Sequence, residues 1–366
     1  MQLPVMPPIK PMLARATTTV PEADGLLYEP KWDGYRCVVF RDGDEVELSS
    51  RGQKSLTRYF PELIDPIRAQ LPRRCVVDCE VVVVTPDGLD FDLLGQRIHP
   101  AESRIERLSV ETPASLVVFD LLALDEVDLR PMAFIERRGA LVSLLADVIP
   151  PVHLSPVTDD PEVAQDWFRR FEGAGFDGVM AKRSDGVYEE DKRSLTKVKH
   201  RHSIDVVVAG YRPHKSGDGV GSMMLGLYDR PEGDRAASLQ HVGVASAFKA
   251  AQRPELAELL APYRLGEGEP HPWTGWADPE QHADGGVRMP GAPHRWSAKR
   301  DHSWVPLRPE LVAEVVVEQL TKGRFRHPAR FQRWRSDRTP RSCTYDQVDI
   351  AAPAELFELF PEAPTP

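Results

Sequence analysis

The sequence has few cysteines and no long apolar run. Its four cysteines form no CxxC pair, and no segment approaches the roughly 20 apolar residues that a membrane-spanning helix needs. The opening segment, MQLPVMPPIKPMLARAT, lacks the apolar centre of a secretory signal. These absences argue against a disulfide-rich secreted domain and against a membrane protein. We therefore expect a reduced protein of the cytoplasm.

Two of the cysteines, Cys75 and Cys79, lie close together in the segment CVVDCEVVVV. Metal binding is one interpretation, because thiolates are common zinc ligands. The other is a pair of small buried thiols in an apolar strand, where free cysteines often occur. The second interpretation is favoured, and we expect no metal at these thiols.

The sequence also lacks a basic excess, since its net charge is -10 over 366 residues. Phosphate backbones attract positively charged domains, so the overall balance argues against a nucleic-acid partner. Positive residues nevertheless gather in KRSLTKVKHRH (192–202) and RHPARFQRWRSDR (326–338). Each run is either a basic face for nucleic acid or ordinary solvated charge.

Residues 1–202 predict a mixed α+β domain, because alternating apolar segments are interleaved with helical patterns. The Asp42-Gly43 pair predicts a hairpin turn, Asp160 an N-cap and Gly173 the end of a helix. We expect strands over residues 26–31, 35–40, 45–50, 75–84 and 115–124, and helices over residues 56–70, 131–148 and 160–175.

Residues 203–366 change to short β-type segments with one helical pattern over residues 248–260. Five or so strands with a single helix indicate a small barrel. Residues 264–298 are rich in Gly, Pro and polar residues and have no period, so we expect a long surface loop there. The expected strands are IDVVVAGY, SMMLGLYD, SLQHVGVA, SWVPL and LVAEVVVEQL.

The octapeptide EPKWDGYR, residues 29–36, is the most distinctive local feature. Residues two apart on a strand share a face, so Glu29 and Lys31 would point the same way just before the Asp33-Gly34 turn. An exposed lysine beside a hairpin turn is the plain alternative. The octapeptide alone does not decide between them.

Two later strands carry further candidates. Asp78 and Glu80 share one face of a Val-rich strand, where two buried carboxylates are costly unless a cation or metal meets them. In SLVVFDLLAL, the residues Val117, Phe119 and Leu121 share a face, and core packing alone would account for Phe119.

The remaining candidates are charged. Asp177 precedes a glycine turn in GFDGVMAKR, and Lys197 and Lys199 point the same way from one strand. Two adjacent like charges repel, so the lysines are either splayed into solvent or shared by a polyanion such as a triphosphate. Arg51, in the segment SRG, is ambiguous by itself.

In order along the chain, KWDGYR, SRG, VVDCEV, VVFDLL, FDGVMAK, KVK and RWRSDR resemble the motifs of the covalent nucleotidyltransferases. Within that superfamily the chain resembles the short bacterial ATP-dependent DNA ligases linked to repair and end joining, over nearly its whole length. The resemblance implies a nucleotidyltransferase (adenylation) domain followed by an OB-fold. It also implies ATP, Mg²⁺ or Mn²⁺, and nicked duplex DNA as partners of a monomer.

The resemblance implies a role for each matching residue. Lys31 matches the nucleophile, whose amine attacks the α-phosphate of ATP and leaves a phosphoramidate-linked AMP. Phe119 matches the aromatic that stacks on adenine, and Glu80 the residue that contacts the ribose or a metal. The other implied nucleotide contacts are Glu29, Arg36, Arg51, Lys182, Arg193, Lys197, Lys199 and Arg335, and Asp177 joins Glu80 as an implied metal ligand.

The chain departs from the family pattern at two places. Asp177 stands where many members have Glu, and Arg338 stands where the last motif usually has Lys. The large N-terminal DNA-binding domain of longer ligases has no counterpart, so we expect weak, salt-sensitive DNA binding without sequence readout, with a possible repair or end-joining protein as helper.

Two other functions remain open at this stage. An RNA ligase or a capping guanylyltransferase shares the lysine motif and the two-domain plan. A non-catalytic DNA-end binder would keep the fold without the chemistry, although the presence of Lys31, Glu80 and Lys199 together argues against it. The choice between ATP and GTP and between nicked DNA and nicked RNA would separate a DNA ligase from an RNA ligase or a capping guanylyltransferase. Attachment of AMP to the protein would exclude the non-catalytic DNA-end binder.

Overall fold

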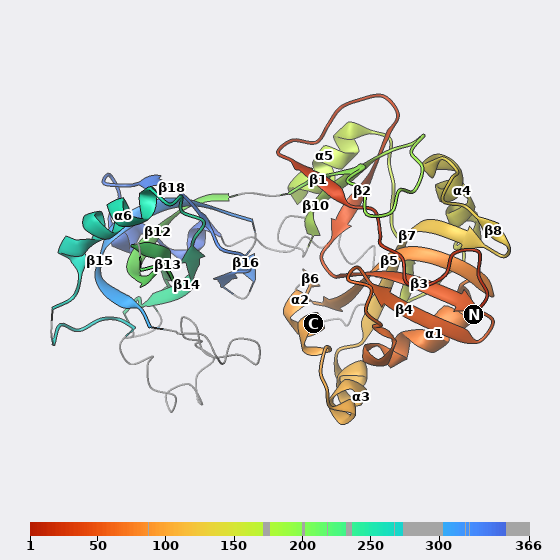
Figure 1. The fold of residues 1–366 in the computed structure, drawn as a ribbon, viewed down its shortest axis with the longest axis horizontal. Helices are drawn as coiled ribbons and strands as arrows, with labels where there is room; N and C mark the ends of the chain where they lie inside the picture. The colour runs from red at the N-terminus through yellow and green to blue at the C-terminus, as the bar shows by residue number, and fades with distance from the viewer. Residues whose placement is uncertain are drawn as a thin grey trace. The chain divides into compact units, whose positions relative to one another are not determined.

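The computed structural model describes residues 1–86, 88–170, 176–199, 202–217, 219–231, 236–266, 268–273, 303–318, 320–321 and 323–348. The chain forms two compact units, one over residues 1–200 and one over residues 201–349 (Figure 1). In the described ranges, no helix is long and apolar enough to cross a membrane.

The larger sheet of the first unit has the order β4-β3-β5-β7-β8, and two short strands extend it. Neighbours along this order are antiparallel, while β9 pairs parallel to β7. The predicted hairpin is confirmed, because Asp42 pairs with Glu45 and Gly43 has a φ of 64°. The strands are β3 (Tyr35–Asp42), β4 (Glu45–Ser50), β5 (Arg74–Thr85), β6 (Gly88–Leu89), β7 (Ala114–Leu124), β8 (Val127–Asp128) and β9 (Val152–Leu154).

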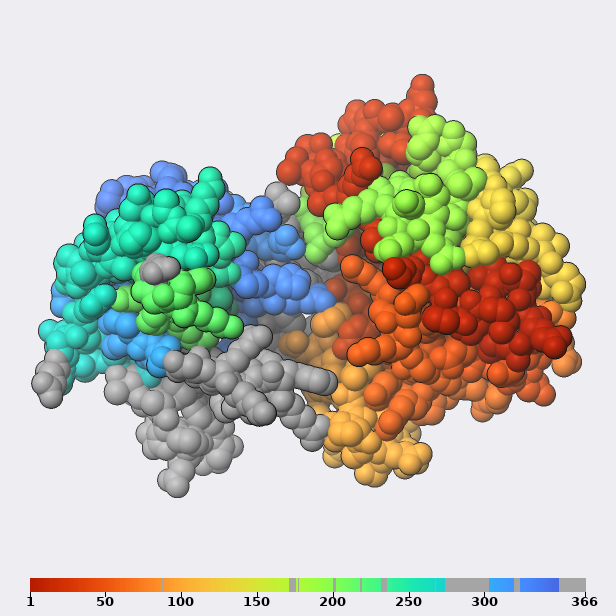
Figure 2. All heavy atoms as spheres, in the orientation of Figure 1, coloured from red at the N-terminus to blue at the C-terminus, as the bar shows by residue number. Residues whose placement is uncertain are grey.

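The smaller sheet has the order β1-β11-β10-β2, with β1 (Ala14–Thr17), β11 (Leu195–Val198), β10 (Phe176–Arg183) and β2 (Leu26–Trp32). Figure 2 shows the N-terminal segment against the segment that contains β11, as the parallel β1–β11 pairing requires. The chain passes from β2 into β3 of the larger sheet through Asp33-Gly34. Only glycine fits there, because a Cβ on Gly34 would lie 2.1 Å from the carbonyl oxygen of Val81.

Five α-helices accompany the sheets in the described part of the first unit: α1 (Ile64–Gln70), α2 (Phe91–Gln96), α3 (Glu102–Glu111), α4 (Phe134–Leu144) and α5 (Pro161–Arg170). The helix expected over residues 56–70 is only partly helical. Pro61 disfavours the helical conformation at Phe60, so two 3₁₀ turns, Thr57–Tyr59 and Pro61–Leu63, precede α1. Asp160 caps α5 by accepting from the Glu162 amide at 2.7 Å. Gly173 lies outside the described residues.

The two faces of β5 pack against different neighbours. Cys75, Val77, Cys79 and Val81 belong to a core that includes Phe60, Ile67 and Leu141. Val76 belongs to a second core, in which Val38 and Phe40 of the larger sheet meet Leu195 and Met180 of the smaller one. The cysteines are free buried thiols. Alternation therefore turns Asp78 and Glu80 towards the smaller sheet.

The second unit contains a five-stranded sheet with the order β14-β13-β12-β15-β18. A bridge between Ala245, at the end of β14, and Ala329, just before β18, joins its two edges into a barrel. The short pair β16 (Leu320–Thr321) and β17 (Arg324–Phe325) stands apart, and α6 spans Gln252–Leu260. The barrel strands are β12 (His202–Pro213), β13 (Val220–Tyr228), β14 (Leu239–Ala245), β15 (Val305–Val317) and β18 (Arg330–Trp334).

One expectation for this unit was wrong. SWVPL and LVAEVVVEQL form one long strand, β15, because β12 pairs with both parts and shifts its register between Val208 and Gly210. Of the surface loop expected over residues 264–298, Gly266 and Glu269 are exposed, whereas Trp273 is completely buried and its Nε1 donates to the Leu239 carbonyl oxygen at 2.8 Å. Residues 274–302 lie outside the described part of the chain.

Candidate active site

The two sheets of the first unit bring most of the candidate residues into one layer. Glu29, Met180 and Lys197 are paired in one row across the smaller sheet. Arg36 and Glu80 are paired in a row across the larger sheet. Because side chains of both sheets share one core at this level, the two rows lie on facing surfaces.

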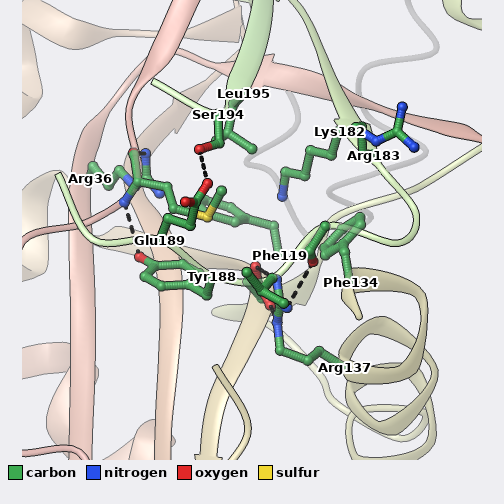
Figure 3. A pocket seen from close by; sticks show the side chains of 14 residues that line it. Arg36, Phe119, Phe134, Arg137, Lys182, Arg183, Tyr188, Glu189, Ser194 and Leu195 are labelled. Carbon is green, nitrogen blue, oxygen red and sulfur yellow. Dashed lines mark hydrogen bonds and ion pairs between the residues drawn. The ribbon is translucent and has the colours of Figure 1, made fainter. Parts of the chain in front are cut away.

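A pocket opens between these surfaces (Figure 3). Its cavity volume is about 110 Å³. Arg36 and Lys182 lie on opposite sides of it, and Phe119 lies between them. Its wall combines aromatic, aliphatic and charged groups from the segment before β1, from β3, β7, α4 and β10, and from β11 with the segment before it: Met12, Arg36, Phe119, Asp120, Phe134, Arg137, Lys182, Arg183, Gly186, Val187, Tyr188, Glu189, Ser194 and Leu195.

A β-bulge places Phe119 in this wall. Asp78 pairs with Asp120 and Cys79 with Val118, so Phe119 is the extra residue between two paired positions. The expectation that Val117, Phe119 and Leu121 share a face was wrong. Val117 packs near Trp32, whereas Leu121 packs in the opposite core, because the bulge reverses the alternation.

Glu29 lies beside the pocket as a buried carboxylate, 2% exposed. Its Oε2 is 2.6 Å from Lys182 Nζ, and its Oε1 is 3.7 Å from Arg138 Nη1. Lys182 Nζ is in turn 4.7 Å from the ring centre of Phe119 and 4.6 Å from that of Phe134. An ion pair therefore adjoins the face of the aromatic ring.

Asp78 forms a bidentate ion pair with the Arg36 guanidinium. Arg36 Nε and Nη2 donate to the two carboxylate oxygens at 3.0 and 2.6 Å, and Arg36 Nη1 donates to the Met12 carbonyl oxygen at 2.6 Å. Tyr188 donates from its hydroxyl to Asp78 Oδ2 at 2.6 Å. A guanidinium has five N–H groups, so this arrangement leaves donors of Arg36 for a ligand.

Glu80 is half-buried on β5, and burial raises the pKa of its carboxyl to about 8. The positive charges of Lys31 and Arg36 oppose this shift, while Asp33 and Asp78 add to it. A carboxyl in this state readily exchanges its proton for a cation. Lys31, the predicted nucleophile, lies on β2 within electrostatic range of it.

The other candidates lie at the rim or outside this layer. Arg51 is exposed, and its backbone amide donates to the Arg36 carbonyl oxygen at 3.2 Å. Arg193 is exposed at a second groove with Arg15 and Lys192. Lys199 follows the last residue of β11.

Arg335 lies in the second unit, where it forms ion pairs with Asp205 at 2.9 Å and Asp337 at 2.7 Å. Arg338 Nε is 3.2 Å from Asp205 Oδ2. The last motif is therefore anchored to β12 of its own barrel.

The metal predictions rest on Glu80 and Asp177. Asp177 belongs to β10, but its side chain lies outside the described residues. The expected glycine turn after it was wrong, because Gly178 continues the strand through a bulge. Within the ranges described, no group of three His, Cys, Asp or Glu side chains could hold a metal ion.

Sequence reasoning missed two arginines beside the pocket. Arg137 and Arg138 are buried, and Arg137 donates to both carboxylate oxygens of Asp120 at 2.9 and 3.0 Å. Their spacing from Phe134 and Leu141 places them on the buried face of α4, which the helical period could have indicated.

Comparison with known proteins shows the family. The model described as "ATP dependent DNA ligase domain" matches residues 11–199, and "ATP dependent DNA ligase C terminal region" matches residues 216–338. DNA ligase C of Mycobacterium tuberculosis is 49% identical and the match covers 99% of both chains. DNA ligase C1 of Mycolicibacterium smegmatis is 45% identical, over 99% of this chain and 100% of its own.

A solved structure from a study of Lig E DNA ligases covers 88% of this chain and 99% of its own, at 14% identity and a TM-score of 0.51. This likeness concerns the fold. Together with the two family models it confirms the predicted class, an α+β nucleotidyltransferase domain followed by an OB-fold. The family models match both domains in the predicted order, and the relatives match over nearly their whole length. The chain belongs to the family of ATP-dependent DNA ligases.

Proposed function

We propose that this chain seals nicks in duplex DNA through an AMP carried on Lys31. The Lys31 amine attacks the α-phosphorus of ATP, a P–N bond forms, and the bond to the β-phosphate breaks with release of pyrophosphate. AMP then passes to the 5′-phosphate of the nick. The 3′-hydroxyl attacks that phosphate and expels AMP, which closes the strand.

One observation carries this proposal: β2 holds Lys31 within electrostatic range of Glu80, while Glu29 on the same strand lies beside the pocket of Phe119. A nucleophile, an acidic group and an aromatic wall thus meet at one edge of the two sheets. Phosphoryl transfer requires mainly positioning and neutralisation of charge, which such a site supplies.

The pocket suits adenine. Phe119 offers an aromatic ring for stacking, and the Arg36 guanidinium, 5.6 Å from the ring centre, is a donor for the ribose or the phosphates. Glu29 Oε1 finds no hydrogen-bond donor in the described part of the chain, and it can accept from the amino group of the base. Lys182, paired with Glu29, is the complementary donor. Guanine would present its carbonyl oxygen to the carboxylate and be disfavoured.

The residues present fit a divalent cation in part. Mg²⁺ or Mn²⁺ bound at Glu80, with Asp177 as second ligand, would neutralise charge that develops on the phosphates. Glu80 itself would release its proton when it meets the cation, since burial otherwise keeps that carboxyl protonated. The remaining positive charge along the phosphate path comes from Lys197, Lys199, Arg51 and Arg193.

Residues 1–202 form the adenylation domain and residues 203–366 the OB-fold domain in this proposal. Arg335 acts from the second domain on the departing pyrophosphate. The chain works as a monomer in the cytoplasm, and its free buried thiols are consistent with a reducing compartment. The two domains grip nicked DNA by its backbone, and a repair or end-joining protein adds to that grip.

The test is mass spectrometry of the protein after incubation with ATP and Mg²⁺, beside a gel assay of nick sealing. The wild type gains the mass of AMP and seals the nick. Lys31→Ala and Lys31→Arg do neither, because a guanidinium does not lose its proton near neutral pH. AMP attachment to either variant would exclude Lys31 as the nucleophile, and its absence in the wild type would favour a non-catalytic DNA-end binder.

A further inference from the structure

Glu29 is a carboxylate that the fold buries between two cations. Lys182 reaches it from the neighbouring strand β10, and Arg138 reaches it from helix α4. A buried carboxylate is costly unless cations and hydrogen bonds meet it. The two partners therefore compensate the charge of Glu29 and decide which of its oxygens remains available.

Arg138 is anchored independently of Glu29. Its Nη2 donates to the carbonyl oxygen of Ser155, and the hydroxyl of Ser155 accepts from Trp32 Nε1 at 3.0 Å. Trp32 directly follows Lys31 at the end of β2. Arg138 thus ties helix α4 to the segment after β9 and to the strand that carries Glu29 and Lys31.

The two oxygens of Glu29 are in different states. Oε2 is engaged by Lys182 at 2.6 Å, whereas Oε1 is 3.7 Å from Arg138 Nη1, which is too far for a hydrogen bond. Neither Oε1 nor Arg138 Nη1 has a hydrogen-bond partner among the residues described. Arg138 therefore supplies charge to Oε1 while leaving its lone pairs for another donor.

We propose that Arg138 is a positioning residue for base selection: it holds the Glu29 carboxylate so that Oε1 accepts the amino group of adenine. This inference rests on the proposed function, in which Glu29 contacts that amino group. In base selection Arg138 acts through Glu29. Its loss should weaken the use of a purine with an amino group and leave a purine without one almost unaffected.

The experiment measures KM and kcat for self-adenylation of the full chain with two nucleotides, ATP and purine riboside 5′-triphosphate, which lacks the amino group. Arg138→Met should raise KM for ATP about 10-fold, the effect of losing support for a charged hydrogen bond, with less change in kcat. KM for the purine analogue should change less than about 2-fold, since no amino group contacts Oε1 there. Sealing of nicked DNA that already carries 5′-AMP should be retained.

Arg97→Met is the matched control, because Arg97 is also fully buried in the first unit and pairs with Glu62 at 2.5 Å. It should lower thermal stability without separating the two nucleotides. Arg138→Met would overturn the inference if it raised KM equally for both. If this variant does not fold, Arg138→Lys serves in the same comparison, and an equal effect on both nucleotides would again overturn it.

Glu29→Gln separates this inference from the proposed function. If Glu29→Gln raises KM for ATP alone and Arg138→Met does not, the role of Arg138 is refuted. Base reading by Glu29 would then stand. Equal losses for both nucleotides in Glu29→Gln would refute base reading by Glu29, and with it the role of Arg138, whereas the proposed function is refuted only if the wild type gains no AMP.

Discussion

Arg36 on β3 and Asp78 on β5 form a bidentate ion pair, with N–O distances of 3.0 and 2.6 Å, and Asp78 is completely buried. Tyr188 adds a third hydrogen bond to the same carboxylate. The pair thus links the larger sheet to the segment before β11 and aims the guanidinium at the pocket.

Asp78→Asn should destabilise the protein, because it leaves the Arg36 charge without its buried partner. Breaking such a pair costs about 3 kcal/mol in free energy of unfolding. Tyr188→Phe should cost about 1.5 kcal/mol, the contribution of one hydrogen bond to a charged group. Urea unfolding measures both. Asp185→Asn, in the exposed pair with Arg183, is the control that should change little. Similar losses in all three variants would contradict a special role for Asp78.

Phe119→Ala should weaken ATP binding more than DNA binding. Base stacking on an aromatic ring contributes about 1 to 3 kcal/mol, and the substitution also removes the ring beside Lys182. Calorimetric titration with ATP and fluorescence titration with nicked duplex DNA compare the two affinities in the same variant. Equal losses for both ligands would indicate that Phe119 only supports the core.

Glu80→Gln should alter how stability depends on pH. The folded carboxyl has a pKa near 8, above its unfolded value, so the folded state holds more protons between about pH 4.5 and 8. Wild-type stability should therefore fall as pH rises through that window, by up to about 1.4 kcal/mol per pH unit. Glu80→Gln removes this slope. It should melt at a higher temperature than the wild type at pH 8 without Mg²⁺, and adenylation should be lost. A slope that persists in Glu80→Gln would show that another group titrates.

Arg335→Gln combined with Asp337→Asn should slow formation of Lys31-AMP far more than closure of pre-adenylated nicked DNA. The reason is the proposed alignment of pyrophosphate by the last motif. Deleting residues 324–366 is a less specific test, because it removes β18, which pairs with β15. Single-turnover rates of both steps decide the question, and thermal melting checks that the barrel survives the loss of the pair with Asp205. Equal slowing of both steps, or normal adenylation, would refute the closure role.

The sequence by itself determined the features that depend on neighbours along the chain. Strand alternation placed Asp78 and Glu80 on one face and Glu29 and Lys31 on another, because the period of a strand is two. The order of the motifs indicated the family, and the change in pattern after His202 indicated a barrel. Each of these needs only local conformation and residue type.

The tertiary structure decided which of these faces meet and what lies between them. A bulge against β5 turned Asp120 towards the pocket and Leu121 into the opposite core, which alternation within β7 alone could not predict. Helix α4 delivers Arg138 to Glu29, and β10 delivers Lys182, across long stretches of sequence. Such contacts depend on strand register and sheet packing between distant segments, and no local pattern encodes the distance between two side chains that only the folded core brings together.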